Sequence, residues 1–286
     1  MEAKAEKTKD VRTVKADDGV ELHYEVLGEG PPVVLLHGGL VGRSAFTRMR
    51  GALAEIYTMI LPSSRGHDGT ELALPPDYGF ETSEVRDLTA VLDAEGLDRV
   101  HLIGHSSGGS TAFAFARDCP DQVDHLILIE PSLINILPAA DLRSCTATAH
   151  EILDAGEQNG DMAALRVSMN GLGGVAWNAL DEATKFNRLE RLAPMAPFVV
   201  PHWRILLDFA VTPSDLEALK PPTLLFYGTE SFDFEPLIAA VWRKYRSDLP
   251  MITVEGAGHN VHHDRPDIVN PVARGNFTPR RSQIRT

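Results

Sequence analysis

One stretch constrains the fold of this chain more than any other. The apolar run Val100-His101-Leu102-Ile103 leads into Gly104-His105-Ser106-Ser107-Gly108, and small residues follow. This G-x-S-x-G pattern predicts a strand, a tight turn and a helix, with Ser106 at the apex of the turn. Glycine is needed at both ends, because a side chain at 104 or 108 would press against neighbouring backbone. Such an elbow lifts the serine Oγ off a sheet and places it beside the free N–H groups of a helix N-terminus.

Other short apolar segments resemble the strand that precedes Ser106. They lie at 33–36, 57–61, 123–129, 223–227 and 251–254. The segment 33–36 is wholly apolar, which is typical of a strand in a parallel sheet that is buried on both faces. Segments between them, such as 85–92, repeat apolar residues every three to four positions and predict helices. Asp18-Gly19 between two alternating segments predicts a β-hairpin near the N-terminus. We therefore expect an α/β fold with a mostly parallel, doubly wound sheet.

This alternation is interrupted once. Between 132 and 221 the strand patterns vanish, and proline and glycine divide the segment into several expected helices. We predict a helical cap over 132–221, inserted into an α/β core formed by 1–131 and 222–275. Within these bounds, residues 1–10 are expected to be a disordered lead-in. Residues 276–286 are rich in arginine and are expected to form a loose basic tail.

Composition excludes several classes of protein. The net charge of −13 argues against nucleic-acid binding. No apolar run approaches the roughly 18 residues of a membrane span, and the Lys/Glu-rich start Met1–Asp10 does not resemble a signal peptide. Two cysteines, Cys119 and Cys145, make no disulfide framework, so we expect free thiols in a cytoplasmic protein. Whether the chain forms a homodimer is left open.

The motifs, taken in order, resemble those of the α/β-hydrolase superfamily over about residues 11–275. A His37-Gly38-Gly39 loop follows an early strand, an Arg65-Gly66 loop follows the next, and the Ser106 elbow comes before the predicted cap. Gly258-His259 then follows the final strand. The resemblance implies an α/β-hydrolase fold with an inserted helical cap.

The same resemblance implies roles for four residues. Ser106 becomes the nucleophile and His259 the base, while the backbone N–H groups of Gly39 and Ser107 become the oxyanion-hole donors. This agrees with the chemistry, because a serine hydroxyl is a weak nucleophile until an imidazole takes its proton. A tetrahedral oxyanion in turn needs N–H donors.

The acid that completes the triad departs from the commonest pattern. Relatives usually place it three residues after the glycine that ends the strand 223–227, but that position is Ser231. We favour Glu130, because it ends the strand that follows the elbow and would lie at the sheet edge that carries His259. A buried glutamate there needs a partner, and His259 would be one. The alternatives are an acid at Glu230, an acid at Asp233, or an ion pair of Glu130 with Arg65.

A narrower resemblance points to a substrate class. Ser106-Ser107-Gly108, Glu130-Pro131, Asp215–Leu219 and Thr229–Phe232 are similar to segments of the zearalenone lactonases. That family opens the macrocyclic ester of a fungal lactone with a Ser-Glu-His triad. The resemblance implies a serine hydrolase for a hydrophobic or aromatic lactone, which would be a small-molecule substrate.

Large apolar residues are candidates for contacting such a substrate. Leu40 follows the oxyanion glycine, and Phe198 and Trp203 lie in the predicted cap, as do Trp177 and Phe186. For each residue in the cap, packing within the cap is the alternative. A substrate that is apolar or aromatic would need a lining of this kind.

No cofactor or metal is expected. The cluster His259, His262, His263 and Asp264 lacks the further Cys or His residues that would complete a tetrahedral metal site. A general carboxylesterase and a C–C bond hydrolase are rival enzymes, and a small-molecule receptor on the same fold is the rival without catalysis. Epoxide hydrolase and dehalogenase activities are disfavoured, because they need an aspartate where Ser106 stands.

Overall fold

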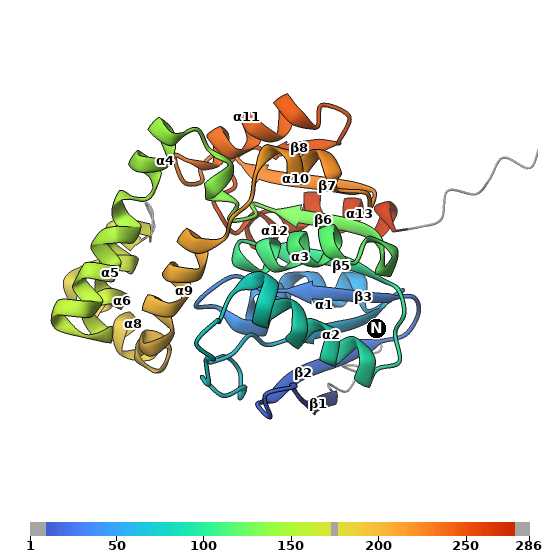
Figure 1. Ribbon diagram of the computed structural model, residues 1–286, viewed down its shortest axis with the longest axis horizontal. Helices are drawn as coiled ribbons and strands as arrows, with labels where there is room; N and C mark the ends of the chain where they lie inside the picture. The colour runs from blue at the N-terminus through green and yellow to red at the C-terminus, as the bar shows by residue number, and fades with distance from the viewer. Residues whose placement is uncertain (1–9, 173–176, 278–286) are drawn as a thin grey trace, which may run out of the picture.

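A computed structural model describes residues 10–172 and 177–277, and these form an eight-stranded sheet flanked by helices (Figure 1). The strand order is β1-β2-β4-β3-β5-β6-β7-β8. The strands are β1 (Asp10–Lys15), β2 (Glu21–Gly28), β3 (Pro32–Leu36), β4 (Thr58–Pro62), β5 (Val100–His105), β6 (Val123–Ile129), β7 (Thr223–Gly228) and β8 (Met251–Val254). Pairs β1–β2 and β2–β4 are antiparallel, and the other neighbours are parallel. The predicted mostly parallel sheet and N-terminal hairpin are confirmed.

Helices cover both faces of the sheet, which is why the central strands are mostly apolar. On one face lie α1 (Thr47–Leu53), α12 (Val261–Asp264) and α13 (Pro266–Asn276), and on the other α2 (Val85–Ala94), α3 (Ser107–Asp118) and α11 (Glu235–Tyr245). Met49 and Val269 pack in the cluster of the first face, Phe113 and Trp242 in that of the second. Burial of this apolar surface, worth about 25 cal/mol per Å², stabilises the layers.

Between β6 and β7 the described residues form helices. They are α4 (Ala139–Cys145), α5 (Ala147–Asn159), α6 (Asp161–Leu172), α8 (Glu182–Leu192), α9 (Ala196–Asp208) and α10 (Pro213–Ala218). In Figure 1, α5, α6 and α8 stand apart from the sheet, with α9 on the side nearer to it. Ile152, Leu165 and Trp177 pack together in a separate cluster, so this helical segment has a core of its own. Short turns complete the chain: η1 (Gly42–Phe46), η2 (Phe80–Glu84), η3 (Pro120–Gln122), η4 (Ile134–Ile136) and η5 (Ala193–Met195).

Both ends of the expected core differ from the prediction. Asp10 belongs to β1, where it pairs with Val26, instead of the expected lead-in. Asn276 ends α13, and Phe277 is buried with its ring stacked 4.4 Å from that of His101, so neither belongs to a loose tail. An aromatic ring that fills a gap beside the sheet cannot be recognised from an arginine-rich composition. The rest of the expected lead-in (1–9), part of the predicted glycine-rich break (173–176) and the rest of the tail (278–286) lie outside the described residues.

The expectations about membrane spans and cysteines can be compared with the described residues. None of their helices combines the length and apolarity needed to cross a membrane. Cys119 and Cys145 are both free thiols.

Candidate active site

Ser106 occupies a strained turn between β5 and α3, with φ 55° and ψ −123°. A non-glycine residue at such angles costs on the order of 1–3 kcal/mol and persists only where the surroundings hold it. Backbone hydrogen bonds supply that restraint. The Ser106 N–H donates to the Ile129 carbonyl over 3.0 Å, and the Ser106 carbonyl accepts from the N–H groups of Ser132 and Gly109.

The two glycines of the elbow are required by close backbone contacts. A Cβ atom on Gly104 would lie 2.5 Å from the Gly108 carbonyl oxygen, and one on Gly108 would lie 2.2 Å from that of Leu36. Both distances are far below van der Waals contact. The predicted need for glycine at 104 and 108 is confirmed.

Glu130, at the end of β6, lies against His259. The distance from His259 Nδ1 to Glu130 Oε2 is 2.6 Å, and the glutamate is completely buried. The Gly228 N–H donates to Glu130 Oε1 over 2.7 Å, and the Ser231 hydroxyl donates to Oε2. Three donors therefore satisfy a carboxylate that would be costly to bury alone. Glu130 has φ 44°, a second strained non-glycine residue at this edge of the sheet.

The alternatives for the acid are placed elsewhere. Glu230 and Asp233 are exposed. Arg65 forms two 2.8 Å hydrogen bonds with Asp87 and one of 2.6 Å with Asp18, so the alternative in which it pairs with Glu130 is wrong.

Ser132 was missed by the sequence reasoning. Its Oγ lies 3.2 Å from Ser106 Oγ, and the two hydroxyls share a hydrogen bond. The hydroxyls of nucleophilic serines often adopt their reactive geometry only with substrate bound.

His259 is held from its other sides, because His105 Nε2 donates to its carbonyl oxygen over 3.0 Å and the Phe232 ring lies 4.6 Å from its ring.

Gly39 and Ser107 line one small cavity. Ser107 is the first residue of α3, where N–H groups have no acceptor within the helix. Gly39 is tightly covered, since a Cβ atom there would lie 2.5 Å from His202 Nε2. Leu40 follows with φ 63°, so the loop is strained beside the cavity.

The predicted substrate contacts divide into two groups. Phe198 lines the cavity beside Gly39, with its ring 4.7 Å from that of His67 and 5.1 Å from that of His202. Leu40 and Trp203 pack against the core of the helical segment, and their contact with a substrate stays a prediction. In the same way, the Trp177 indole is buried and donates to Asn170 Oδ1, whereas Phe186 is 57% exposed.

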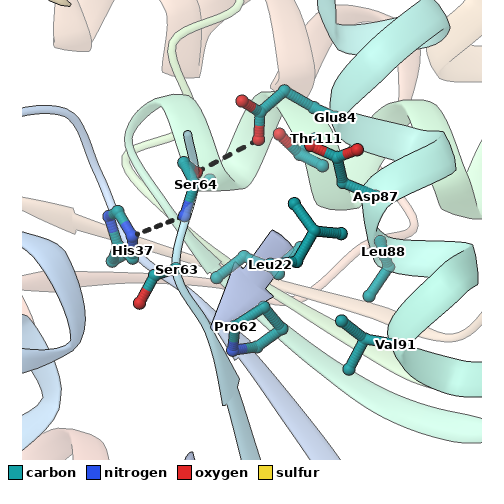
Figure 2. A pocket seen from close by; sticks show the side chains of 12 residues that line it. Leu22, His37, Pro62, Ser63, Ser64, Glu84, Asp87, Leu88, Val91 and Thr111 are labelled. Atoms are coloured by element: carbon teal, nitrogen blue, oxygen red, sulfur yellow. Dashed lines mark hydrogen bonds between the residues drawn. The ribbon is translucent and has the colours of Figure 1, made fainter. Parts of the chain in front are cut away.

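A polar network lies directly behind this cavity, around an adjoining pocket. Figure 2 shows Ser64 between His37 and Glu84: the Ser64 N–H donates to His37 Nε2, and its hydroxyl donates to Glu84 Oε2, each over 3.1 Å. Burial, helped by the charge of Asp87, raises the pKa of Glu84 to about 7. These groups hold the loop that follows β4 against the loop that carries Gly39.

The histidines at the cavity are neutral at ordinary pH. Burial lowers the pKa of His202 to about 3, and burial is also the main cause that lowers the pKa of His67 to about 3. Neutral imidazoles can donate or accept hydrogen bonds without bringing a charge into an apolar site.

Glu235 is a second acid near His259 that the sequence reasoning overlooked. It begins α11, is completely buried, and places Oε1 3.8 Å from His259 Nδ1. Neither of its carboxyl oxygens has a hydrogen-bond partner among the described residues. Burial, and then repulsion by Glu130, raise its pKa well above the usual range.

The two glutamates and the histidine are also a candidate metal site. Glu130, Glu235 and His259 each offer a ligand atom, all within 4.8 Å of one another. However, two tetrahedral zinc ligands, each 2.0–2.2 Å from the ion, lie about 3.3 Å apart. The 2.6 Å between His259 Nδ1 and Glu130 Oε2 fits a shared proton instead. The residues therefore fit an acid–base pair better than a metal centre.

Such a sheet, with a serine elbow after β5 and a buried acid–histidine pair at the same edge, defines the α/β-hydrolase fold. The alpha/beta hydrolase family matches residues 33–272, and the chain belongs to this family. Solved structures agree with the fold: the epoxide hydrolase CorEH has a TM-score of 0.74 at 23% identity, covering 95% of this chain and 99% of that one. A single-residue mutant of the meta-cleavage product hydrolase CumD has a TM-score of 0.72 at 20% identity, covering 93% and 97%.

Curated relatives are similar over shorter stretches. The soluble epoxide hydrolase of Corynebacterium sp. (strain C12) is 39% identical over 123 residues, 41% of each chain. The 2-hydroxy-6-oxo-6-phenylhexa-2,4-dienoate hydrolase of Comamonas testosteroni is 34% identical over 114 residues, 38% of this chain and 40% of that one. The matched part thus spans about two fifths of the length of these relatives.

Proposed function

We propose that this chain is a cofactor-free serine hydrolase that cleaves a carboxylic ester through an acyl-enzyme. The observation that carries the proposal is the 2.6 Å hydrogen bond between the buried Glu130 and His259, at the sheet edge where the strained Ser106 stands. Nucleophile, base and acid on neighbouring segments are the arrangement that acyl transfer requires.

In the first half-reaction Ser106 Oγ attacks the ester carbonyl carbon while His259 Nε2 takes the hydroxyl proton. The serine hydroxyl must first turn from Ser132 toward His259. Glu130 accepts a hydrogen bond from Nδ1–H of His259, which fixes the tautomer and stabilises the imidazolium. The N–H groups of Gly39 and Ser107 receive the oxyanion.

His259 then returns its proton to the leaving alkoxide as the C–O bond breaks. In a lactone the new hydroxyl remains attached to the acyl chain. His259 next deprotonates a water molecule, whose oxygen attacks the acyl carbon and releases Ser106. The product is a hydroxy acid that is heavier than the lactone by one water.

The lining of the cavity supports a hydrophobic or aromatic substrate, and the choice of a lactone of the zearalenone type rests on the sequence resemblance. Phe80, Phe198 and Ile205 give it apolar walls, and the neutral His67 and His202 can hydrogen-bond a hydroxyl or carbonyl group. A pocket with apolar walls and a few polar groups is suited to such a ligand.

Hydrolysis of a C–C bond is the second candidate, favoured by the similarity to the Comamonas testosteroni hydrolase. Epoxide opening is not proposed despite the similar epoxide hydrolase. Attack by a serine alkoxide on an epoxide would leave an ether, which water does not cleave under these conditions. A carboxylate nucleophile leaves an ester that water can release.

A panel of substrates tests the proposal. It contains zearalenone, smaller aromatic lactones, aryl esters and a 2-hydroxy-6-oxo-dienoate, each followed by mass spectrometry with wild type and Ser106→Ala. We expect lactone turnover with a gain of one water, and none with Ser106→Ala. Turnover of the dienoate alone would favour the C–C hydrolase, and tight binding of a lactone without any turnover would favour a receptor.

A further inference from the structure

Two carboxyl groups converge on the same nitrogen of His259. Glu130 comes from the end of β6, and Glu235 comes from the start of α11, the segment that follows β7. Their distances to His259 Nδ1 are 2.6 Å and 3.8 Å. A serine hydrolase needs one acid in this place, so the second requires an explanation.

The surroundings of Glu235 differ from those of Glu130. Glu130 accepts three hydrogen bonds, whereas both oxygens of Glu235 are buried with no partner among the described residues. The groups that face it are Glu130, His259 and the phenol of Tyr227 on β7, which is also buried without a partner in the described part of the chain. A carboxyl group left this way is stable only in its neutral, protonated form.

The helix that carries Glu235 favours ionisation of its carboxyl group, in contrast to these surroundings. Glu235 is the first residue of α11, where the helix dipole favours a negative charge. Burial and the neighbouring charge of Glu130 oppose ionisation. Removal of the Glu130 charge would leave burial as the main opposing effect, with the imidazolium of His259 as a counter-charge.

Resting on the proposed function, we propose that Glu235 is a reserve acid for His259. It is a positioning residue that stays neutral beside the Glu130–His259 pair. When the charge of Glu130 is lost, Glu235 orients His259 and stabilises its imidazolium form. In that state Glu235 gives its proton to solvent and its carboxylate accepts the Nδ1–H of His259.

The test compares wild type, Glu130→Gln, Glu235→Gln and the double variant by kcat/KM on an aryl ester. Glu130→Gln should lose about 10²- to 10⁴-fold, and the double variant at least tenfold more. Glu235→Gln alone should lose less than tenfold. The residual activity of Glu130→Gln should rise with pH as Glu235 ionises, and this rise should vanish in the double variant. Glu130→Gln/Asp233→Asn, which changes an exposed carboxylate nearby, is the matched control and should match Glu130→Gln.

NMR titration of the His259 ring gives a readout that does not depend on turnover. The pKa of His259 in Glu130→Gln should exceed that in the double variant by about one unit, the equivalent of a tenfold change. Equal pKa values and equal activities in these two proteins would overturn the proposal, as would a loss in Glu235→Gln as large as that in Glu130→Gln. If wild type turned over no ester, the hydrolase function would fail while the titration still decided the role of Glu235.

Discussion

Glu130 and His259 are 129 positions apart in the chain, and their side chains share a 2.6 Å hydrogen bond. They meet because β6, β7 and β8 are parallel neighbours whose carboxyl ends lie at one edge. The end of β7 and the loop after it contribute hydrogen-bond donors, because the Gly228 N–H and the Ser231 hydroxyl both donate to Glu130. At Ser231, the position where the resemblance would place the acid, the side chain instead donates a hydrogen bond to Glu130 from the preceding strand.

Replacement of Glu130 should be costly for activity. Glu130→Gln should lower kcat/KM by about 10²- to 10⁴-fold, because His259 loses both its orientation and its counter-charge. Kinetics on an aryl ester, with the melting temperature as a check on folding, measures this. Glu230→Gln and Asp233→Asn alter exposed carboxylates and should change kcat/KM less than twofold. A large loss in Asp233→Asn with little in Glu130→Gln would reverse the assignment.

The loop that carries Gly39 should not tolerate a side chain. In Gly39→Ala the new Cβ would lie 2.5 Å from His202 Nε2, so the His202 ring or the loop must shift, and a shift of the loop would move its N–H away from the proposed oxyanion position. We expect a loss of about 10²- to 10³-fold in kcat. Gly51→Ala, where the Cβ meets open space, is the control. Adding His202→Ala to Gly39→Ala should recover part of the activity. Full activity in Gly39→Ala would contradict the role of this loop.

The glycine before the elbow should matter for stability. A Cβ on Gly104 would meet the Gly108 carbonyl oxygen at 2.5 Å and Ala112 Cβ at 2.7 Å. Gly104→Ala should therefore lower the free energy of unfolding by about 2–4 kcal/mol in urea titrations. Gly275→Ala, on α13 with open space around it, should raise it slightly. Equal stability of the two variants would refute the packing argument.

Stability should fall in mild acid, because several buried histidines must be charged on unfolding. Burial lowers the pKa of His262 to about 3, so the unfolded chain binds the proton first as pH falls below about 6.5. The contribution of the neutral, buried His262 to the free energy of unfolding is complete above pH 6.5, and about 2 kcal/mol of it is lost at pH 5. Glu84, whose pKa is raised to about 7, opposes the trend, since its proton stabilises the fold below that pH.

Urea unfolding of His262→Leu at pH 7.5 and 5 measures this effect. The loss of free energy between the two pH values should be smaller than in wild type by about 2 kcal/mol. His263→Leu, which changes an exposed neighbour, should lose as much as wild type. An identical loss in wild type and His262→Leu would show that His262 is not the source.

The features that the sequence predicted are those in which local pattern and geometry coincide. Glycines around Ser106 reflect contacts a few residues away, and an acid at the end of an apolar strand must lie at the sheet edge. Glu235 could not be found this way, because a glutamate at the start of a helix usually stabilises the helix dipole in solvent. Its burial depends on the distant loop that carries His259. The same holds for His202, which reaches Gly39 from α9.

The central claim is that Ser106 is a nucleophile activated by His259 and Glu130. Labelling of the folded protein with a fluorophosphonate probe, followed by mass spectrometry of the peptide that contains Ser106, tests it most directly. We expect one adduct on Ser106, which is absent in Ser106→Ala and after heat denaturation and forms far more slowly in Glu130→Gln. A folded wild-type protein that stays unlabelled, or that is labelled at another residue, would contradict the claim.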